Sequence, residues 1–188
     1  MNLNSLKFLV SGNKLLRNLF YIFFQNRFML KDIELEISNS KILQTQLFLN
    51  YQKLKRTSKL LPHFDDIGFR VFSQNDEDGI LLYIFSLIGT QNKKCVEIAS
   101  GTPYGANTTN LICNWGWSGL LVEGDKSAVD QSNNFFKSHK DTFLYPPKII
   151  NSWITRETVN NILAENQFTG IIDLLSLDLD GVDYWIWD

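Results

Sequence analysis

Short apolar segments alternate with segments of helical pattern from residue 94 onward, and this alternation restricts the fold more than any other feature of the chain. The apolar segments cover residues 94–100, 119–125, 147–154 and 171–180. The helical segments between them cover residues 107–115, residues 126–140, and a stretch that Thr155 is predicted to cap. Apolar strands joined through helices are typical of parallel β-α-β units. The sequence therefore predicts an α/β fold with a doubly wound, mainly parallel sheet of about four strands.

Charge divides the chain into two parts. Residues 1–60 carry ten Lys and Arg against three Asp and Glu, a formal charge of +7. Residues 61–188 carry eight against seventeen, a formal charge of −9. We therefore expect a basic helical extension over residues 1–62 and an acidic domain over residues 63–188. The acidic domain would repel phosphates, which argues against a nucleic-acid partner.

The basic extension is predicted to contain two amphipathic helices, over residues 13–30 and residues 40–60. One interpretation is that both helices pack on the domain or on a partner. The other is that the basic, aromatic helix over residues 13–30 lies on an anionic membrane surface. Polar and charged side chains interrupt the stretch from Leu15 to Leu30, so we do not expect it to span a membrane.

The two cysteines, Cys95 and Cys113, lie in apolar surroundings and lack a CxxC spacing. This pattern favours neither a disulfide framework nor a zinc site. It predicts reduced thiols and a cytoplasmic protein, with a membrane-peripheral location as the variant that the basic extension suggests.

Three acids, Asp76, Glu77 and Asp78, precede an apolar helical segment that Gly89 is expected to end. Acids at a helix start accept hydrogen bonds from N–H groups that have no partner within the helix, and they suit the helix dipole. We therefore predict that this cluster begins the helix.

Ligands of doubly wound sheets bind beyond the carboxyl ends of the strands. The loop after the first strand contains the small residues Ala99, Ser100 and Gly101, which allow a ligand to approach the backbone. The second strand ends at Glu123, which is placed to accept hydrogen bonds from ribose hydroxyls. Each feature alone is also a common structural element. Their combination favours a nucleoside ligand, although the loop lacks the GxGxxG pattern of dinucleotide sites.

The third strand ends near Asn151, Ser152 and Trp153. The two polar side chains are placed to form hydrogen bonds with a base edge. Trp153 is placed either to pack on the face of that base or to join the core.

The fourth strand delivers Asp178 and Asp180 to one face, because side chains two residues apart in a strand point the same way. Two carboxylates held close together need a cation, a hydrogen-bond donor or a shared proton. A divalent metal is one candidate, and helix capping by Asp180 or Asp183 is the other. Asp178 lies within the strand, where capping does not explain it, and Asp183 is predicted to start the next helix.

From Phe72 onward the chain resembles the FkbM-like branch of the class I S-adenosylmethionine-dependent methyltransferases. Four blocks carry the resemblance, in the order "SQNDEDGI", "VEIASG…NTTNL", "GWSGLLVEGD" and "IDLLSLDLDGVDYW". It implies a Rossmann-like sheet with S-adenosylmethionine lying across the first two strands. Glu97 and the Ala99-Ser100-Gly101 turn would face the methionine part of this cofactor, and Glu123 its ribose. The remaining implied site residues are Asn151 and Ser152 near the adenine and Asp178 beside the transferred methyl group.

The resemblance also implies an activity, O-methylation of a sugar or another small hydroxyl acceptor. Asp178 would position the acceptor or act as a base, with Asp180 second, and a divalent metal would suit both. Two rival hypotheses stay open. One is a non-catalytic Rossmann-like module that binds a nucleoside or a partner, and the other is peripheral membrane association as the main role.

Two features depart from the family pattern. Ala99 stands where the family usually has its first glycine, which is acceptable if the φ angle of Ala99 is negative. The family fold also has about three strands beyond the fourth, and without them the fourth strand would leave an exposed apolar edge. We therefore expect this chain to be a fragment that lacks the C-terminal strands.

Overall fold

The structure is a computed structural model, and it describes residues 40–179 and 181–187. The chain divides into two compact units, Met1–Gln46 and Leu47–Asp188, and the second unit contains the sheet. The first described element is a helix over residues 40–56. The helix predicted over residues 13–30 lies outside the described residues, and the predicted division at residue 62 stays a prediction.

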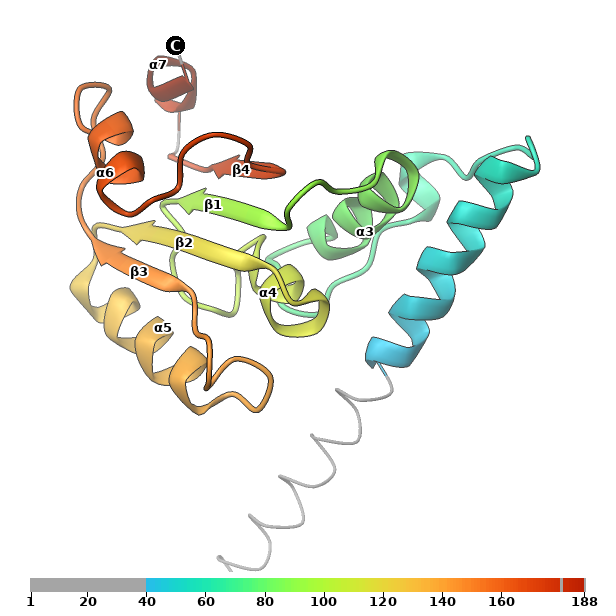
Figure 1. The fold of residues 1–188 in the computed structure, drawn as a ribbon, viewed down its shortest axis with the longest axis horizontal. Helices are drawn as coiled ribbons and strands as arrows, with labels where there is room; N and C mark the ends of the chain where they lie inside the picture. The colour runs from blue at the N-terminus through green and yellow to red at the C-terminus, as the bar shows by residue number, and fades with distance from the viewer. Residues whose placement is uncertain (1–39, 180, 188) are drawn as a thin grey trace, which may run out of the picture. The chain divides into compact units, whose positions relative to one another are not determined.

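Four parallel strands form one sheet, in the order β3-β2-β1-β4 (Figure 1). The central strand β1 pairs Glu97 with Leu121 of β2 on one side and with Ser176 of β4 on the other. This arrangement confirms the predicted α/β, Rossmann-like fold. The strands are β1 (Lys94–Ile98), β2 (Ser118–Glu123), β3 (Lys148–Asn151) and β4 (Leu174–Leu177).

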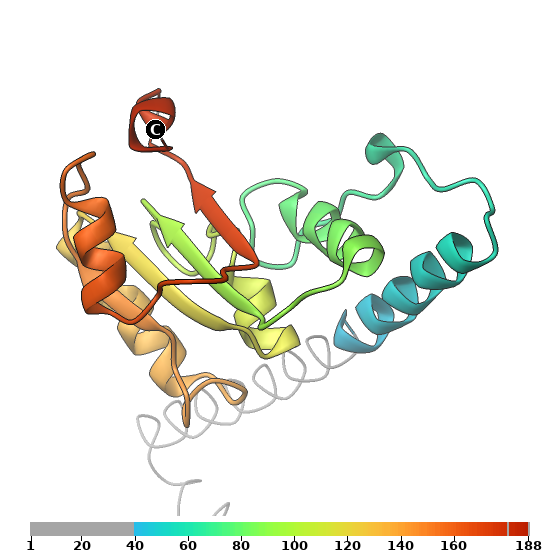
Figure 2. The same ribbon diagram turned by 45° about the horizontal axis from the view of Figure 1, so that its top comes forward.

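Helices cover both faces of the sheet. Alternate strand residues point to opposite faces, so each face has its own apolar core cluster. One core cluster contains Cys95 and Leu121, and the other contains Val96 and Val122. The second cluster packs against α6 (Val159–Glu165). Figure 2 shows this layered arrangement from a second direction. The first cluster packs against α3 (Glu77–Ile88), α4 (Thr109–Trp115) and α5 (Lys126–Ser138).

Several predicted helix ends agree with the structure, and two do not. The helix predicted over residues 40–60 ends at residue 56. Gly89 follows α3 with a φ of 80°, and Asp183 opens α7 (Asp183–Trp187), as predicted. Thr155 does not cap α6, which begins at Val159. The Thr155 carbonyl accepts hydrogen bonds from the N–H groups of Thr158 and Val159, both at 3.1 Å. These bonds close a turn before the helix, so the N-cap residue of α6 is Thr158.

Candidate functional site at the carboxyl end of the sheet

The loop after β1 turns sharply at Ala99, whose φ of 59° lies in the left-handed region. The turn is held by β2, since the N–H groups of Ala99 and Ser100 both donate to the Val122 carbonyl, at 2.9 and 3.3 Å. From the sequence alone, alanine is acceptable at this position on the condition of a negative φ, and this condition is not met. A left-handed alanine costs roughly 1–2 kcal/mol relative to the right-handed conformation.

Glu123, the last residue of β2, links the two loops that follow β1 and β2. Its Oε2 accepts a hydrogen bond from the Gly101 N–H and its Oε1 one from the Asp125 N–H, both at 2.7 Å. The side chain is partly exposed. A carboxylate has about four lone-pair sites, so these two bonds leave acceptor capacity for a ligand hydroxyl.

Trp153 is 80% exposed and packs over the backbone at Gly124. A Cβ atom at Gly124 would lie 2.6 Å from Cδ2 of the Trp153 ring, so any larger residue there would displace the ring. The Asn151 side chain fixes this corner, because its Nδ2 donates to the carbonyls of Glu123 and Gly124, both at 3.0 Å. Of the two predicted places for Trp153, the structure therefore favours the exposed one.

Ser152 lies between these residues and contributes mainly through its backbone. Its N–H donates to the Glu123 carbonyl at 3.0 Å, and its Oγ donates to the Trp153 carbonyl at 3.2 Å. Together Glu123, Asn151 and Trp153 therefore form one corner of the sheet edge, as their positions at strand ends predicted.

Glu97 lies inside the protein, with 3% of its surface exposed. Its carboxylate accepts hydrogen bonds from the Asn107 N–H at 2.8 Å, the Thr108 N–H at 3.0 Å and the Thr108 hydroxyl at 2.5 Å. Burial raises the pKa of Glu97, these hydrogen bonds oppose the rise, and the charge of Asp178 adds to it. Glu97 therefore holds the start of α4 in place.

Asp178 follows β4 and is exposed. It lies one residue beyond Leu177, which pairs with Ile98 of β1, and its charge adds to the rise in the pKa of Glu97. Asn107 ties this side of the edge together, because its Nδ2 donates to the Ser176 hydroxyl at 3.1 Å. Asp180 lies outside the described residues, so the predicted pairing of Asp178 with Asp180 stays a prediction.

Ser100 supplies a buried polar atom. The residue is 5% exposed, and its Oγ has no hydrogen-bond partner among the described residues. Buried hydroxyl groups normally have a partner. This orphaned atom in the turn between β1 and Gly101 is compatible with a ligand or a water that completes the site.

The described residues contain no group of three or more His, Cys, Asp or Glu side chains that could hold a metal ion. Both oxygens of Glu97 already accept hydrogen bonds from the chain. Beside β1 and β4, Asp178 is the described acid that is left as an exposed ligand, and one carboxylate does not make a divalent-cation site. The described residues therefore do not fit a metal by themselves.

One functional feature was missed by the sequence analysis. Asp78 does not cap its own helix; its Oδ2 accepts hydrogen bonds from three successive N–H groups, those of Val71, Phe72 and Ser73, at 2.7, 2.7 and 2.9 Å. Ser73 in turn forms a parallel bridge with Gly105 in the loop after β1. Asp78 therefore braces the candidate site from the preceding segment. The "SQNDEDG" block was the available signal, but it does not reveal the bridge partner.

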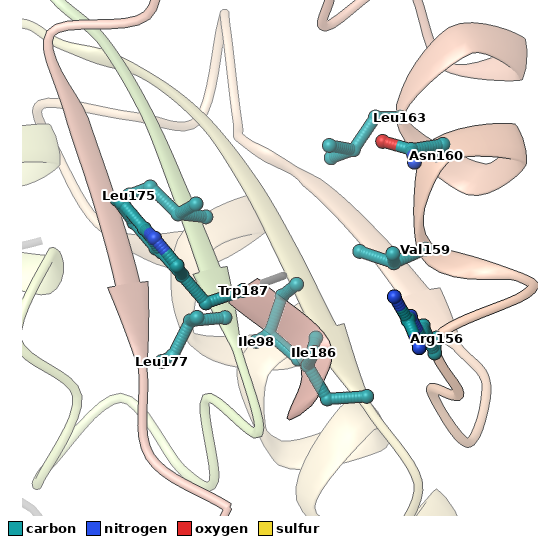
Figure 3. A pocket seen from close by; sticks show the side chains of 9 residues that line it. All are labelled: Ile98, Arg156, Val159, Asn160, Leu163, Leu175, Leu177, Ile186 and Trp187. Carbon is teal, nitrogen blue, oxygen red and sulfur yellow. The ribbon is translucent and has the colours of Figure 1, made fainter. Parts of the chain in front are cut away.

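A small cavity of about 210 Å³, lined by apolar side chains together with Arg156 and Asn160, lies between β4, α6 and α7. In Figure 3 the side chains of Leu175, Leu177 and Trp187 border one side, and those of Val159, Leu163 and Arg156 border the other. The lining contains no acid, so this cavity offers room beside the end of β4 without a group that could remove a proton.

Comparison of the chain with protein-family models, with curated proteins and with solved structures finds no match. Among the described residues, no helix combines the length and the apolar character that crossing a membrane requires.

Proposed function

We propose that the chain belongs to an S-adenosylmethionine-dependent methyltransferase that acts on a hydroxyl of a sugar or another small acceptor. The observation that carries the proposal is the corner formed by Glu123, the Gly101 turn and the exposed ring of Trp153 over Gly124. A carboxylate at this place suits ribose hydroxyls, and a free ring face suits adenine. The resemblance to FkbM-like methyltransferases suggests that this nucleoside is part of S-adenosylmethionine, the sulfonium cofactor.

The chemistry of the proposed reaction is divided between cofactor and protein. S-adenosylmethionine, when bound, supplies a methyl group on a positively charged sulfur that leaves readily. The chain has to hold the acceptor hydroxyl in line and to accept its proton. Asp178 is the proposed group for this task, because it is exposed and directly follows Leu177, which pairs with Ile98 at the end of β1. Asp180 is the second candidate for this role. A metal, if used, would be held by Asp178 and Asp180 together.

The rival proposal is a non-catalytic module that binds a nucleoside or a partner. It is favoured by one observation, namely that Glu97 and Glu123 both have structural hydrogen bonds to main-chain N–H groups. A methyl-transfer assay over a set of hydroxyl compounds separates the two. Labelled methyl groups in a product support the enzyme, and cofactor binding without any transfer supports the module.

Calorimetric titration with S-adenosylmethionine tests the shared binding step. Glu123→Ala removes the proposed ribose acceptor and should weaken binding by about 10- to 100-fold, the effect expected for hydrogen bonds to a charged group. Glu165→Ala is the matched control, since Glu165 is exposed at the end of α6, outside the proposed corner. Its affinity should equal that of the parent.

Glu123 also holds Gly101 and Asp125, so a second variant guards against a folding effect. Trp153→Ala removes an exposed ring and should weaken binding about tenfold while the melting temperature stays within about 2 °C. Equal affinity of parent, Glu123→Ala and Trp153→Ala would remove the nucleoside assignment. Failure of the folded parent to bind would remove the methyltransferase proposal.

A further inference from the structure

A second surface, remote in sequence from the strand ends, is formed by the end of the helix over residues 40–56 and the turn after it. Its apolar members are highly exposed, with 49% of Leu49, 94% of Leu60 and 73% of Ile88 in contact with solvent. Its charged members are exposed cations. We call it the basic-apolar patch, and it consists of Leu49, Lys53, Arg56, Lys59, Leu60 and Ile88.

The helical part of the patch is one stripe. Leu49, Lys53 and Arg56 are spaced by four and three residues, which places them on the same face of a helix. The opposite face is packed, because Tyr51 is buried and its ring centroid lies 4.9 Å from that of Tyr83 in α3. The stripe therefore points outward from the domain.

The end of α3 lies beside this stripe. An open groove of about 400 Å³ is lined by Lys55, Arg56 and Ile88, among others, and the Lys55 ammonium donates to the Leu87 carbonyl at 2.5 Å. Lys55 is thus used to hold α3, whereas Arg56 and Ile88 face the groove. The contact brings the exposed Ile88 next to the cations of the helix.

The turn after the helix is fixed by backbone hydrogen bonds. Ser58 has a φ of 50°, its N–H donates to the Lys55 carbonyl, and the Lys59 N–H donates to the Leu54 carbonyl at 3.1 Å. This pattern is a Schellman motif, which reverses the chain at a helix end. It presents Lys59 and the almost fully exposed Leu60 next to the end of the stripe.

The charge of this region is of one sign. Residues 47–61 contain four Lys and Arg and no Asp or Glu, in contrast to the acidic remainder of the domain. None of Lys53, Arg56 and Lys59 forms an ion pair within the described part of the chain. A nucleic acid or an acidic peptide would satisfy the cations but would leave Leu60 and Ile88 in water.

We propose that the basic-apolar patch docks on the surface of an anionic lipid membrane. The leucines and Ile88 would enter the headgroup region, and the cations would lie at the lipid phosphates, the combination that favours interfacial binding. The proposal is independent of the methyltransferase activity, and it concerns residues 47–61 and Ile88, not the helix predicted over residues 13–30.

Flotation of the full chain with lipid vesicles tests the proposal. One set of vesicles contains phosphatidylcholine alone, and in the other about one lipid in three is phosphatidylserine. The parent should bind the anionic vesicles, and much less the neutral ones. The double variant Lys53→Ser/Arg56→Ser should bind about 30-fold more weakly, since each cation near the surface contributes a factor of about five. Leu60→Ser should weaken binding about tenfold, because a buried leucine side chain is lost.

Lys137→Ser/Lys140→Ser is the matched control, because it removes the same charge from exposed positions at and just beyond the end of α5. Its binding should stay within about twofold of the parent. Equal binding to neutral and anionic vesicles overturns the proposal. An unchanged affinity of the Lys53→Ser/Arg56→Ser variant also overturns it, because binding would then be assigned to residues 1–39. An unchanged affinity of Leu60→Ser overturns it too, because the contact would then be purely ionic.

Discussion

Acidic side chains around the carboxyl end of the sheet fall into two groups that differ in burial. Glu97 and Asp78 are 3% and 1% exposed, and each accepts three hydrogen bonds from the chain. Glu123 is partly exposed and Asp178 is exposed, and both end or follow a strand. The buried acids hold loops in place, whereas the others can meet a ligand. Burial, not residue type, thus separates the anchors from the candidate binding residues.

The acids at the two ends of β4 differ in their hydrogen bonds more than in burial. Asp173, just before the strand, accepts hydrogen bonds from the N–H groups of Gln91, Asn92 and Lys93 at 2.8, 2.8 and 2.6 Å. Partial burial acts to raise the pKa of Asp173, but the main-chain N–H groups outweigh it and lower the pKa. Asp178, just after the strand, is exposed. One strand is therefore bracketed by an anchor and by a candidate site residue.

The largest expected effect is on Asp78. Asp78→Ala would leave three N–H groups without their acceptor in a buried segment, so we expect the free energy of unfolding to fall by about 4 kcal/mol. Asp76→Ala is the control, because Asp76 is exposed and its side chain makes no capping hydrogen bond, and it should change stability by less than about 0.5 kcal/mol. Urea denaturation measures both. Similar values for the two variants would remove the distinction between anchors and surface acids.

The second effect depends on pH. Burial raises the pKa of Glu97 in the folded protein, so its contribution to stability is full below the unfolded value of about 4.3 and is lost as the pH rises through the folded value. The side chain of the Glu97→Gln variant does not titrate, and its amide turns a donor toward main-chain N–H groups. This should lower the free energy of unfolding by about 2 kcal/mol at acid pH. The difference in the free energy of unfolding between parent and variant, measured by urea denaturation, should then shrink as the pH rises. A gap that widens with pH would mean that the hydrogen bonds outweigh burial.

The smallest expected effect concerns the turn beside Glu123. Ala99→Gly relieves a left-handed alanine and should raise the free energy of unfolding by about 1 kcal/mol. Ala164→Gly, in α6, provides a control of opposite sign and should lower it by about 1 kcal/mol. Thermal unfolding of both variants measures these changes in the free energy of unfolding. A destabilising Ala99→Gly would show that the turn is not strained.

The sequence predicted the strands well because each is a short apolar run between helical segments, a signal contained in neighbouring residues. It also placed Glu123 and Asn151 at strand ends, where the structure has them. The placement of Asp178 within the fourth strand is wrong, because β4 ends at Leu177 and Asp178 follows it. It could not predict the φ of Ala99, which depends on hydrogen bonds to Val122. Nor could it show that Asp78 braces the loop bridged to Gly105, because that bridge joins segments about thirty residues apart.

We propose that the Glu123 corner binds a nucleoside while the anchored acids do not. This binding is tested most directly by ¹⁵N-labelled full-length protein titrated with S-adenosylmethionine and followed through its backbone amide signals. The amides of Gly101 and Asp125, which donate to Glu123, should shift, and so should that of Gly124 beneath Trp153. The amides of Gln91, Asn92 and Lys93, bound to Asp173 at the other end of β4, should stay in place. Unchanged signals at Gly101, Gly124 and Asp125 at saturating cofactor would contradict nucleoside binding at the Glu123 corner.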